Sequence, residues 1–197
     1  PHRDTLRSFL WRFTADDLRS LQHAHSRIRE ELLLRMDIRW NAIVDLDATQ
    51  LTVYGNQEGA TVGYNKANRG KKSYSPLLGS EGRTGLSLNF KLRSGHEHSS
   101  IGALPFIKEC LSRFPSTMAC SRLRLRADAG YFVRDIAEFL DGEGHGYAIS
   151  ARITPPIKFK LPGLRFRYFR EHWACAQFNY QPTHWKREHR FIAIRHD

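Results

Sequence analysis

Three aspartates stand where the sequence predicts β-strands to end. Asp45 and Asp47 lie in an apolar run, VDLDAT, and the alternation of a strand places both on one face. Asp128 follows an alternating run, RLRLRA, and precedes a glycine turn. Because a buried strand carries charge at high cost, acids at its carboxyl end indicate a functional site, although a turn or a cap explains one aspartate almost as well. Carboxylates are the ligands that hard cations such as Mg²⁺ prefer.

The elements around these aspartates alternate between strand and helix. Apolar periodicity predicts strands within 40–54 and 73–93, a strand ending at Asp128 and another over 145–151, with helices over 101–114 and 131–140. The order β-β-β-α-β-α-β is that of an α/β domain. Three arginines, Arg122, Arg124 and Arg126, share one face of the strand before Asp128. We therefore expect that face to be incompletely covered, or its arginines to reach out to solvent or DNA phosphate.

The two ends of the chain differ from its middle. Residues 14–36 have apolar residues near helical spacing, and Thr14 with Asp17 predicts an N-terminal cap. This helix has a charged outer face, which suits either a packing helix or part of a DNA-binding arm. At the other end, Arg190–Asp197 alternates like a strand that stops before its turn. In the middle of the chain, Ser99 or Ser100 is available as the N-terminal cap of the 101–114 helix. We expect the chain to be a fragment.

Composition narrows the class of protein. The 31 Lys and Arg against 20 Asp and Glu give a formal charge of +11, and such a surface attracts polyanions. With 41% hydrophobic residues, and no apolar run near the ~18 residues that a membrane span needs, the chain is neither disordered nor membrane-spanning. Three cysteines without a CxxC pair exclude a disulfide framework and a zinc ribbon, and they predict a cytoplasmic, reducing setting.

A basic loop between residues 55 and 72 is interleaved with tyrosines. Its spacing does not fit the nucleotide-binding motif GxxxxGK[ST], because Gly63 and Gly70 are too far apart. Contact with a phosphate backbone remains open, as does an ordinary solvated loop. The residues we expect to contact DNA are Lys66, Arg69, Lys71 and Lys72. The nearby His96, Glu97 and His98 lack the partner spacing of a metal site, and we expect them to be structural.

Four blocks, in this order, resemble the DDE transposases of bacterial insertion sequences. They are VDLDAT (44–49), GYNKANRGKKSYSPLL (63–78), LRSGHEHSS (92–100) and LRADAGY (125–131), and the likeness covers about residues 5 to 197. That family has a ribonuclease H-like core, as retroviral integrases do. The resemblance implies an α/β fold whose mixed sheet is flanked by helices over 40–153. A helical segment over 1–39 would precede it, and a β-rich insertion would begin at 154.

The same resemblance implies a catalytic site and its partners. Asp47, in a D-x-T context with Thr49, and Asp128, in R-x-D-x-G-[FY], match the first two acids of the family. They would hold two Mg²⁺ or Mn²⁺ ions, with Asp47 bridging both and Asp45 as the second choice. Arg126 joins the basic loop among the expected DNA contacts. The implied partner is double-stranded DNA, both element ends and target, bound by a homodimer near the bacterial nucleoid.

The third acid of the family has no counterpart in this sequence. The string Y-x-x-R-x-x-x-E is absent, and Tyr168, Arg170 and Glu171 have the wrong spacing. We expect the glutamate to lie beyond Asp197 and this chain alone to cut DNA poorly. Two alternatives stay open. One is a catalytically dead remnant that binds DNA through its basic surface. The other is a different ribonuclease H-like nuclease that uses Glu138 as its last acid.

Overall fold

The computed structural model describes residues 2–36, 42–65, 67–116 and 123–197, which form two units, residues 1–150 and 151–197. Each unit is described by itself below. Lys66, Arg122 and the first residues of the predicted 40–54 strand region lie outside the described residues. Among the helices of the described chain, none is long and apolar enough to cross a membrane.

A five-stranded mixed sheet is the centre of the first unit. Its order is β6 (Ser87–Lys91), β5 (Leu77–Glu81), β1 (Ile43–Ala48), β7 (Arg124–Ala127) and β8 (Gly146–Ile149). β1 pairs with β5 antiparallel and with β7 parallel, while β5 and β6 are antiparallel and β7 and β8 are parallel. The predicted mixed α/β sheet is confirmed. Its carboxyl ends at β1 and β7 lie next to each other because these two strands run the same way.

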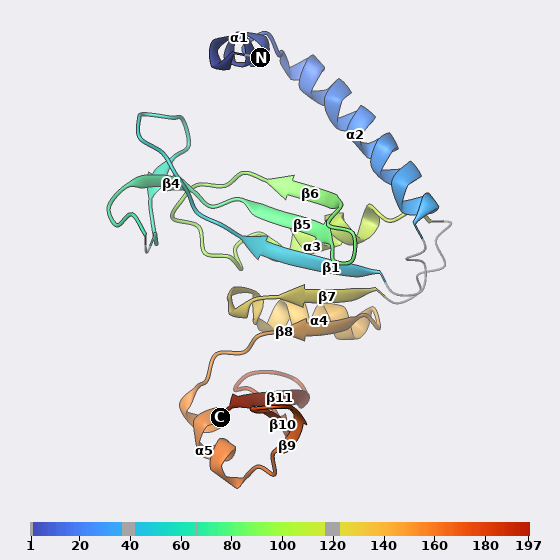
Figure 1. Ribbon diagram of the computed structural model, residues 1–197, viewed down its shortest axis with the longest axis vertical. Coiled ribbons are helices and arrows are strands. Elements are labelled where there is room, and N and C mark those ends of the chain that lie inside the picture. The colour runs from blue at the N-terminus through green and yellow to red at the C-terminus, as the bar shows by residue number, and fades with distance from the viewer. Residues whose placement is uncertain (1, 37–41, 66, 117–122) are drawn as a thin grey trace. The chain divides into compact units, whose positions relative to one another are not determined.

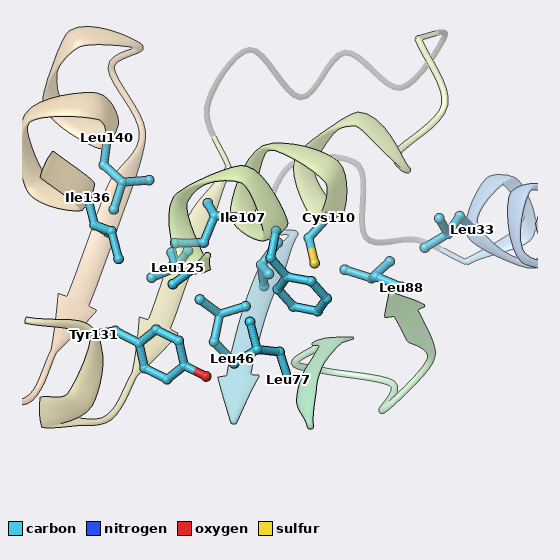
Figure 2. Close-up of a cluster of buried hydrophobic side chains, with 13 residues drawn as sticks. Leu33, Leu46, Leu77, Leu88, Ile107, Cys110, Leu125, Tyr131, Ile136 and Leu140 are labelled. Atoms are coloured by element: carbon cyan, nitrogen blue, oxygen red, sulfur yellow. The ribbon is translucent and has the colours of Figure 1, made fainter. Parts of the chain in front are cut away.

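The hydrophobic core lies between this sheet and two helices on one of its faces, α3 (Ala103–Ser112) and α4 (Arg134–Gly142). Figure 2 shows the side chains of both helices meeting those of the strands. Among the fully buried residues of the core are Val44, Leu77, Leu88, Phe106, Ile107, Leu125, Ile136 and Leu140. α3 comes so close to β5 that a Cβ at Gly79 would lie 2.4 Å from the Sγ of Cys110. Only glycine therefore fits there.

The opposite face of the sheet carries polar and exposed side chains. Asp45 and Arg126 face each other across β1 and β7, and Arg124 is exposed on the same face. Leu78 and Phe90, paired across β5 and β6, are 40% and 55% exposed. Within the described residues of the first unit, no helix covers this face, which accounts for arginines on an internal strand. The expectation of an incompletely covered face is confirmed.

A small second sheet continues from the carboxyl end of β1. It has the order β2 (Leu51–Thr52), β4 (Lys72–Tyr74) and β3 (Thr61–Val62), and it lies beyond the arrowheads of β1 and β7 in Figure 1. The basic loop of residues 55–72 contains β3, and its later part connects β3 to β4. The loop is therefore attached to the edge of the main sheet where Asp47 lies.

Two helices precede the sheet, α1 (Arg3–Leu10) and α2 (Ala15–Arg35). The predicted cap of α2 is confirmed, since the Thr14 amide donates to the Asp17 carboxylate at 2.8 Å and the Asp17 amide donates to the Thr14 hydroxyl at 3.3 Å. The Thr14 hydroxyl and the Thr14 amide both donate to the Asp17 carboxylate, and these two bonds lower the pKa of Asp17. The predicted cap of α3 is wrong, because Gly102 is the N-cap, at φ 67°, and makes no side-chain hydrogen bond.

The second unit is a short helix followed by an antiparallel sheet. The helix is α5 (Pro155–Lys160), and the sheet has the order β11 (His189–His196), β10 (Trp173–Tyr180) and β9 (Arg167–Arg170). Phe178 stacks on Phe191 across β10 and β11, with ring centroids 5.5 Å apart. Ala174 and Ala176 are buried on the same strand. The unit has the β-rich character expected for this part of the chain.

Candidate active site

Asp47 and Asp128 lie at the ends of neighbouring parallel strands. The last paired residues of β1 and β7 are Leu46 and Ala127, and the two aspartates are the next residue of each strand. Adjacent strands are about 4.8 Å apart, so the two carboxylates extend from neighbouring positions at one edge of the sheet. Both residues are exposed. Residues 81 positions apart in the chain are thereby brought side by side.

Each of these aspartates is oriented by a hydrogen bond to nearby backbone. The Asp47 Oδ1 accepts from the Ala48 amide at 2.8 Å, and the Asp128 Oδ1 accepts from the Gly130 amide at 2.8 Å. Asp128 is also the N-cap of the short 3-10 helix η1 (Ala129–Tyr131). The Oδ2 atoms make no hydrogen bond with any described residue. The arrangement leaves one oxygen of each carboxylate available to a ligand.

Asp45, the second choice for the first acid, is committed to another interaction. The Arg126 guanidinium donates from Nε to its Oδ1 at 2.6 Å and from Nη2 to its Oδ2 at 2.5 Å. The same pair raises the pKa of Arg126. Because both oxygens of Asp45 already accept from a cation, the choice of Asp45 does not fit the structure. Arg126 itself remains exposed, and its predicted DNA contact stays a prediction.

A buried arginine, Arg93, fixes a segment next to the site, and the sequence did not predict this role. Its guanidinium donates to three backbone carbonyls: Ser75 at 2.9 Å, His98 at 3.0 Å and Ile101 at 2.7 Å. Burial lowers its pKa. The side chain thereby ties the segment 98–101, which leads into α3, to the start of β5. The block LRSGHEHSS contained this residue, but nothing in the string shows that it is buried.

The segment held by Arg93 lies against the residues that follow Asp128. A Cβ at Gly130 would lie 2.8 Å from the Cβ of Ser99 and 3.0 Å from the Oδ1 of Asp128, so only glycine leaves room for both. The next residue, Tyr131, is fully buried, and its hydroxyl has no hydrogen-bond partner among the described residues. Burial raises the pKa of this phenol, and the charge of Asp128 raises it further. Tyr131 is thus a buried neighbour of the exposed Asp128.

The histidines near the site make structural contacts, as expected. His96 Nδ1 lies 2.9 Å from the Thr61 hydroxyl, and His98 Nδ1 lies 2.9 Å from the Ser100 hydroxyl. Glu138, the alternative last acid, lies on α4 and pairs with Arg134 at 3.9 Å. Across the described residues, no group of three or more His, Cys, Asp or Glu could hold a metal ion. Glu138 is thus not grouped with Asp47 and Asp128 in the described part of the chain, and its use as a last acid stays a prediction.

Two exposed aspartates with an unbonded oxygen each suit a hard divalent cation that completes its ligand shell with water. Mg²⁺ in particular is usually held by only one or two carboxylates and keeps several waters. The donor set at the ends of β1 and β7 therefore fits such an ion.

The basic loop is held in place by its asparagines. Asn65, which is buried, donates to the Thr52 hydroxyl at 2.8 Å, and the Asn68 amide donates to the Asn65 side chain at 3.0 Å. Arg69 and Lys71 are exposed, while Lys72 donates to the Asn56 side chain at 3.2 Å. Three of the four predicted DNA contacts in the loop thus lie on the surface. Lys66 is outside the described residues.

Comparison with solved structures finds transposases at low sequence identity. A piggyBac transposase synaptic complex with hairpin DNA matches with a TM-score of 0.46 and 15% identity, covering 79% of this chain and 33% of that one. A Mos1 transposase paired-end complex matches with a TM-score of 0.41 and 13% identity, covering 67% and 43%. The chain spans less than half the length of either protein. No curated protein matches it.

The match to a family is far more extensive. The family model described as transposase DDE domain group 1 matches residues 3–196, almost the whole chain and both of its units. That range contains the sheet, the two adjacent aspartates, the basic loop and the β-rich unit. The chain therefore belongs to the DDE transposase domain group 1 family.

Proposed function

We propose that this chain carries the catalytic core of a transposase that cleaves the ends of a mobile DNA element and joins their 3′-hydroxyls to target DNA. Its family supports DNA transposition in general. The observation that carries the finer proposal is the parallel register of β1 and β7, which supports a shared role for Asp47 and Asp128. Both aspartates are exposed, which supports access of a polymer substrate to them.

Mg²⁺ or Mn²⁺ is the ion that these two carboxylates would hold. When bound, the ion would activate the attacking hydroxyl and stabilise the leaving oxygen of the phosphodiester. The chain's own part is to fix the two carboxylates. The Ala48 and Gly130 amides orient them, and the buried Tyr131 anchors the turn that follows Asp128. A two-ion site needs a further acid besides this pair.

Double-stranded DNA is the partner that the charge distribution favours. The second unit has ten Lys and Arg against three Asp and Glu, so it carries +7 of the formal charge of +11. In the first unit, Arg69 and Lys71 are exposed on the basic loop, which is attached to the edge of the sheet where Asp47 lies. Exposed cations in each unit support contact with the phosphates of DNA. We expect a homodimer to act on paired element ends.

A strand-transfer assay of the full-length protein, on DNA that carries the element ends, tests this proposal. Asp47→Asn and Asp128→Asn should each abolish Mg²⁺-dependent cleavage and joining while leaving DNA binding intact. Asp45→Asn is the matched control, since it removes a carboxylate on the same strand as Asp47, two residues before it, and should retain activity. Full activity of either of the first two variants would disprove the assignment.

A second candidate function is DNA binding without catalysis. It is favoured by the lack, among the residues that the structure describes, of a third acid beside the aspartate pair. In that case DNA affinity should fall steeply with salt and should not respond to Mg²⁺. Mg²⁺-dependent cleavage by the full-length protein would exclude it.

A further inference from the structure

A cavity of about 670 Å³ lies away from the aspartate pair, between α2, β6 and the end of α3. Two arginines line it: Arg29 of α2 and Arg113, the C-cap of α3. The lining also includes neutral side chains that can donate hydrogen bonds: Gln22, Ser26, Ser87 and Asn89. The cavity is therefore rich in donors and in positive charge.

Neither arginine forms an ion pair with a described acidic residue. Arg29 is 5% exposed, and the described contacts of its Nη1 are long, at 3.4 Å, to the Leu88 carbonyl and His25 Nδ1. No described residue bonds to the Arg113 guanidinium. The Nε atoms of both arginines are buried, and neither has a hydrogen-bond partner among the described residues. Buried donors of this kind are normally satisfied, so within the described part of the chain both guanidiniums lack ligands that they would ordinarily have.

The charges in the cavity do not balance. Arg29 and Arg113 line the same cavity, close enough to repel each other. Burial lowers the pKa of Arg29 and the charge of Arg113 lowers it further, while the charge of Glu30, which is not among the described lining residues, raises it. Glu109 is the one acid among the described lining residues, and it accepts from the Asn89 side chain at 2.8 Å. His23 and His25 also line the cavity and add no negative charge. An anion between the two arginines would offset their repulsion.

We infer that this cavity is a binding site for a phosphate-type oxyanion, held between Arg29 and Arg113. Guanidinium groups suit phosphate oxygens because they present several N–H donors in one plane. The double charge of a phosphate matches two cations, and the neutral donors of Ser26 and Asn89 can serve its remaining oxygens. The ion is either a free phosphate or a phosphate of the DNA backbone. The site does not depend on the proposed transposase activity.

Arg113→Gln is the variant that tests the site, because the Arg113 side chain makes no hydrogen bond with a described residue whose loss would unfold the protein. Arg27→Gln is the matched control, since Arg27 is exposed on α2 and its change in charge is the same. Thermal unfolding is measured with inorganic phosphate or with chloride at equal ionic strength. Phosphate at ten times its Kd should raise the Tm of the parent and of Arg27→Gln by about 3–6 °C.

Arg113→Gln should behave differently in the two buffers. In chloride its Tm should equal or exceed that of the parent, because the repulsion with Arg29 is gone. In phosphate it should gain almost nothing, and calorimetric titration should show about tenfold weaker phosphate binding. An equal phosphate effect on all three proteins, or a lower Tm of Arg113→Gln in both buffers, would overturn the site and leave Arg113 a structural cap of α3.

A second arm of the experiment separates the two sources of the phosphate. If a backbone phosphate fills the cavity, saturating duplex DNA should block phosphate binding, and Arg113→Gln should reduce the salt slope of DNA binding by about one unit relative to Arg27→Gln. If the ligand is a free phosphate, the titration should be unchanged in the presence of DNA, and the slopes of the two variants should be equal.

Discussion

Replacing Arg93 by methionine should destabilise the first unit and loosen the segment next to Asp128. Methionine fills a similar volume but leaves the carbonyls of Ser75, His98 and Ile101 without their donor. A buried acceptor that loses its partner costs about 1–3 kcal/mol, and charged donors lie at the upper part of the range for hydrogen bonds. With three such acceptors partly rehydrated, the free energy of unfolding should fall by about 3–5 kcal/mol.

Urea unfolding followed by circular dichroism measures that loss, and hydrogen exchange locates it. The exchange of amides in 98–101 and around Gly130 should increase more than that of β8, because Arg93 holds the first of these segments and Ser99 contacts the second. Arg93→Lys serves as the control. It keeps the charge but cannot reach all three carbonyls, so it should recover only part of the stability. A loss below about 1 kcal/mol for Arg93→Met would refute the reasoning.

Three further predictions concern single residues. Gly130→Ala should lower the free energy of unfolding by about 1–3 kcal/mol, because the added methyl group would press on Ser99 and the Asp128 carboxylate. Calorimetry should also show weaker Mn²⁺ binding than for the control Gly142→Ala, whose added methyl group has no neighbour within 4 Å. Asp45→Asn should leave Mn²⁺ affinity nearly unchanged; a loss equal to that of Asp47→Asn would contradict the pairing of Asp45 with Arg126. Burial raises the pKa of Cys110 from 9.0 to about 12, so the thiol of the unfolded chain ionises at a lower pH than the thiol of the folded protein. The free energy of unfolding should therefore fall as the pH rises from about 9 to 12, and it should fall less steeply in Cys110→Ala.

Local signals predicted the elements that hold the site. The cap of α2 was predictable because Thr14 and Asp17 interact within one turn of helix. The alternation around Val44 and Leu46 gave the buried face of β1 correctly, since the side chains of a strand alternate whatever its neighbours are. The aspartates at the strand ends followed from the same alternation together with the family resemblance.

The contacts that support the site could not be predicted, because they join distant parts of the chain. The pairing of Asp45 with Arg126 depends on the parallel register of β1 and β7, which no local pattern encodes. Arg93 looks like any surface arginine until the fold buries it against three carbonyls. The predicted serine cap of α3 failed for the same reason, since the carbonyls of 98–101 are fixed by that arginine and Gly102 starts the helix.

The most direct test of the central claim is a crystal structure of the protein grown with Mn²⁺, with the ion located by anomalous scattering. The account predicts a peak between the carboxylates of Asp47 and Asp128, with an oxygen of each at about 2.0–2.6 Å from the ion. It also predicts that Asp45 remains paired with Arg126. A peak bound by Asp45, or no peak beside Asp47 and Asp128 at saturating Mn²⁺, would contradict the claim that these two aspartates form the metal site.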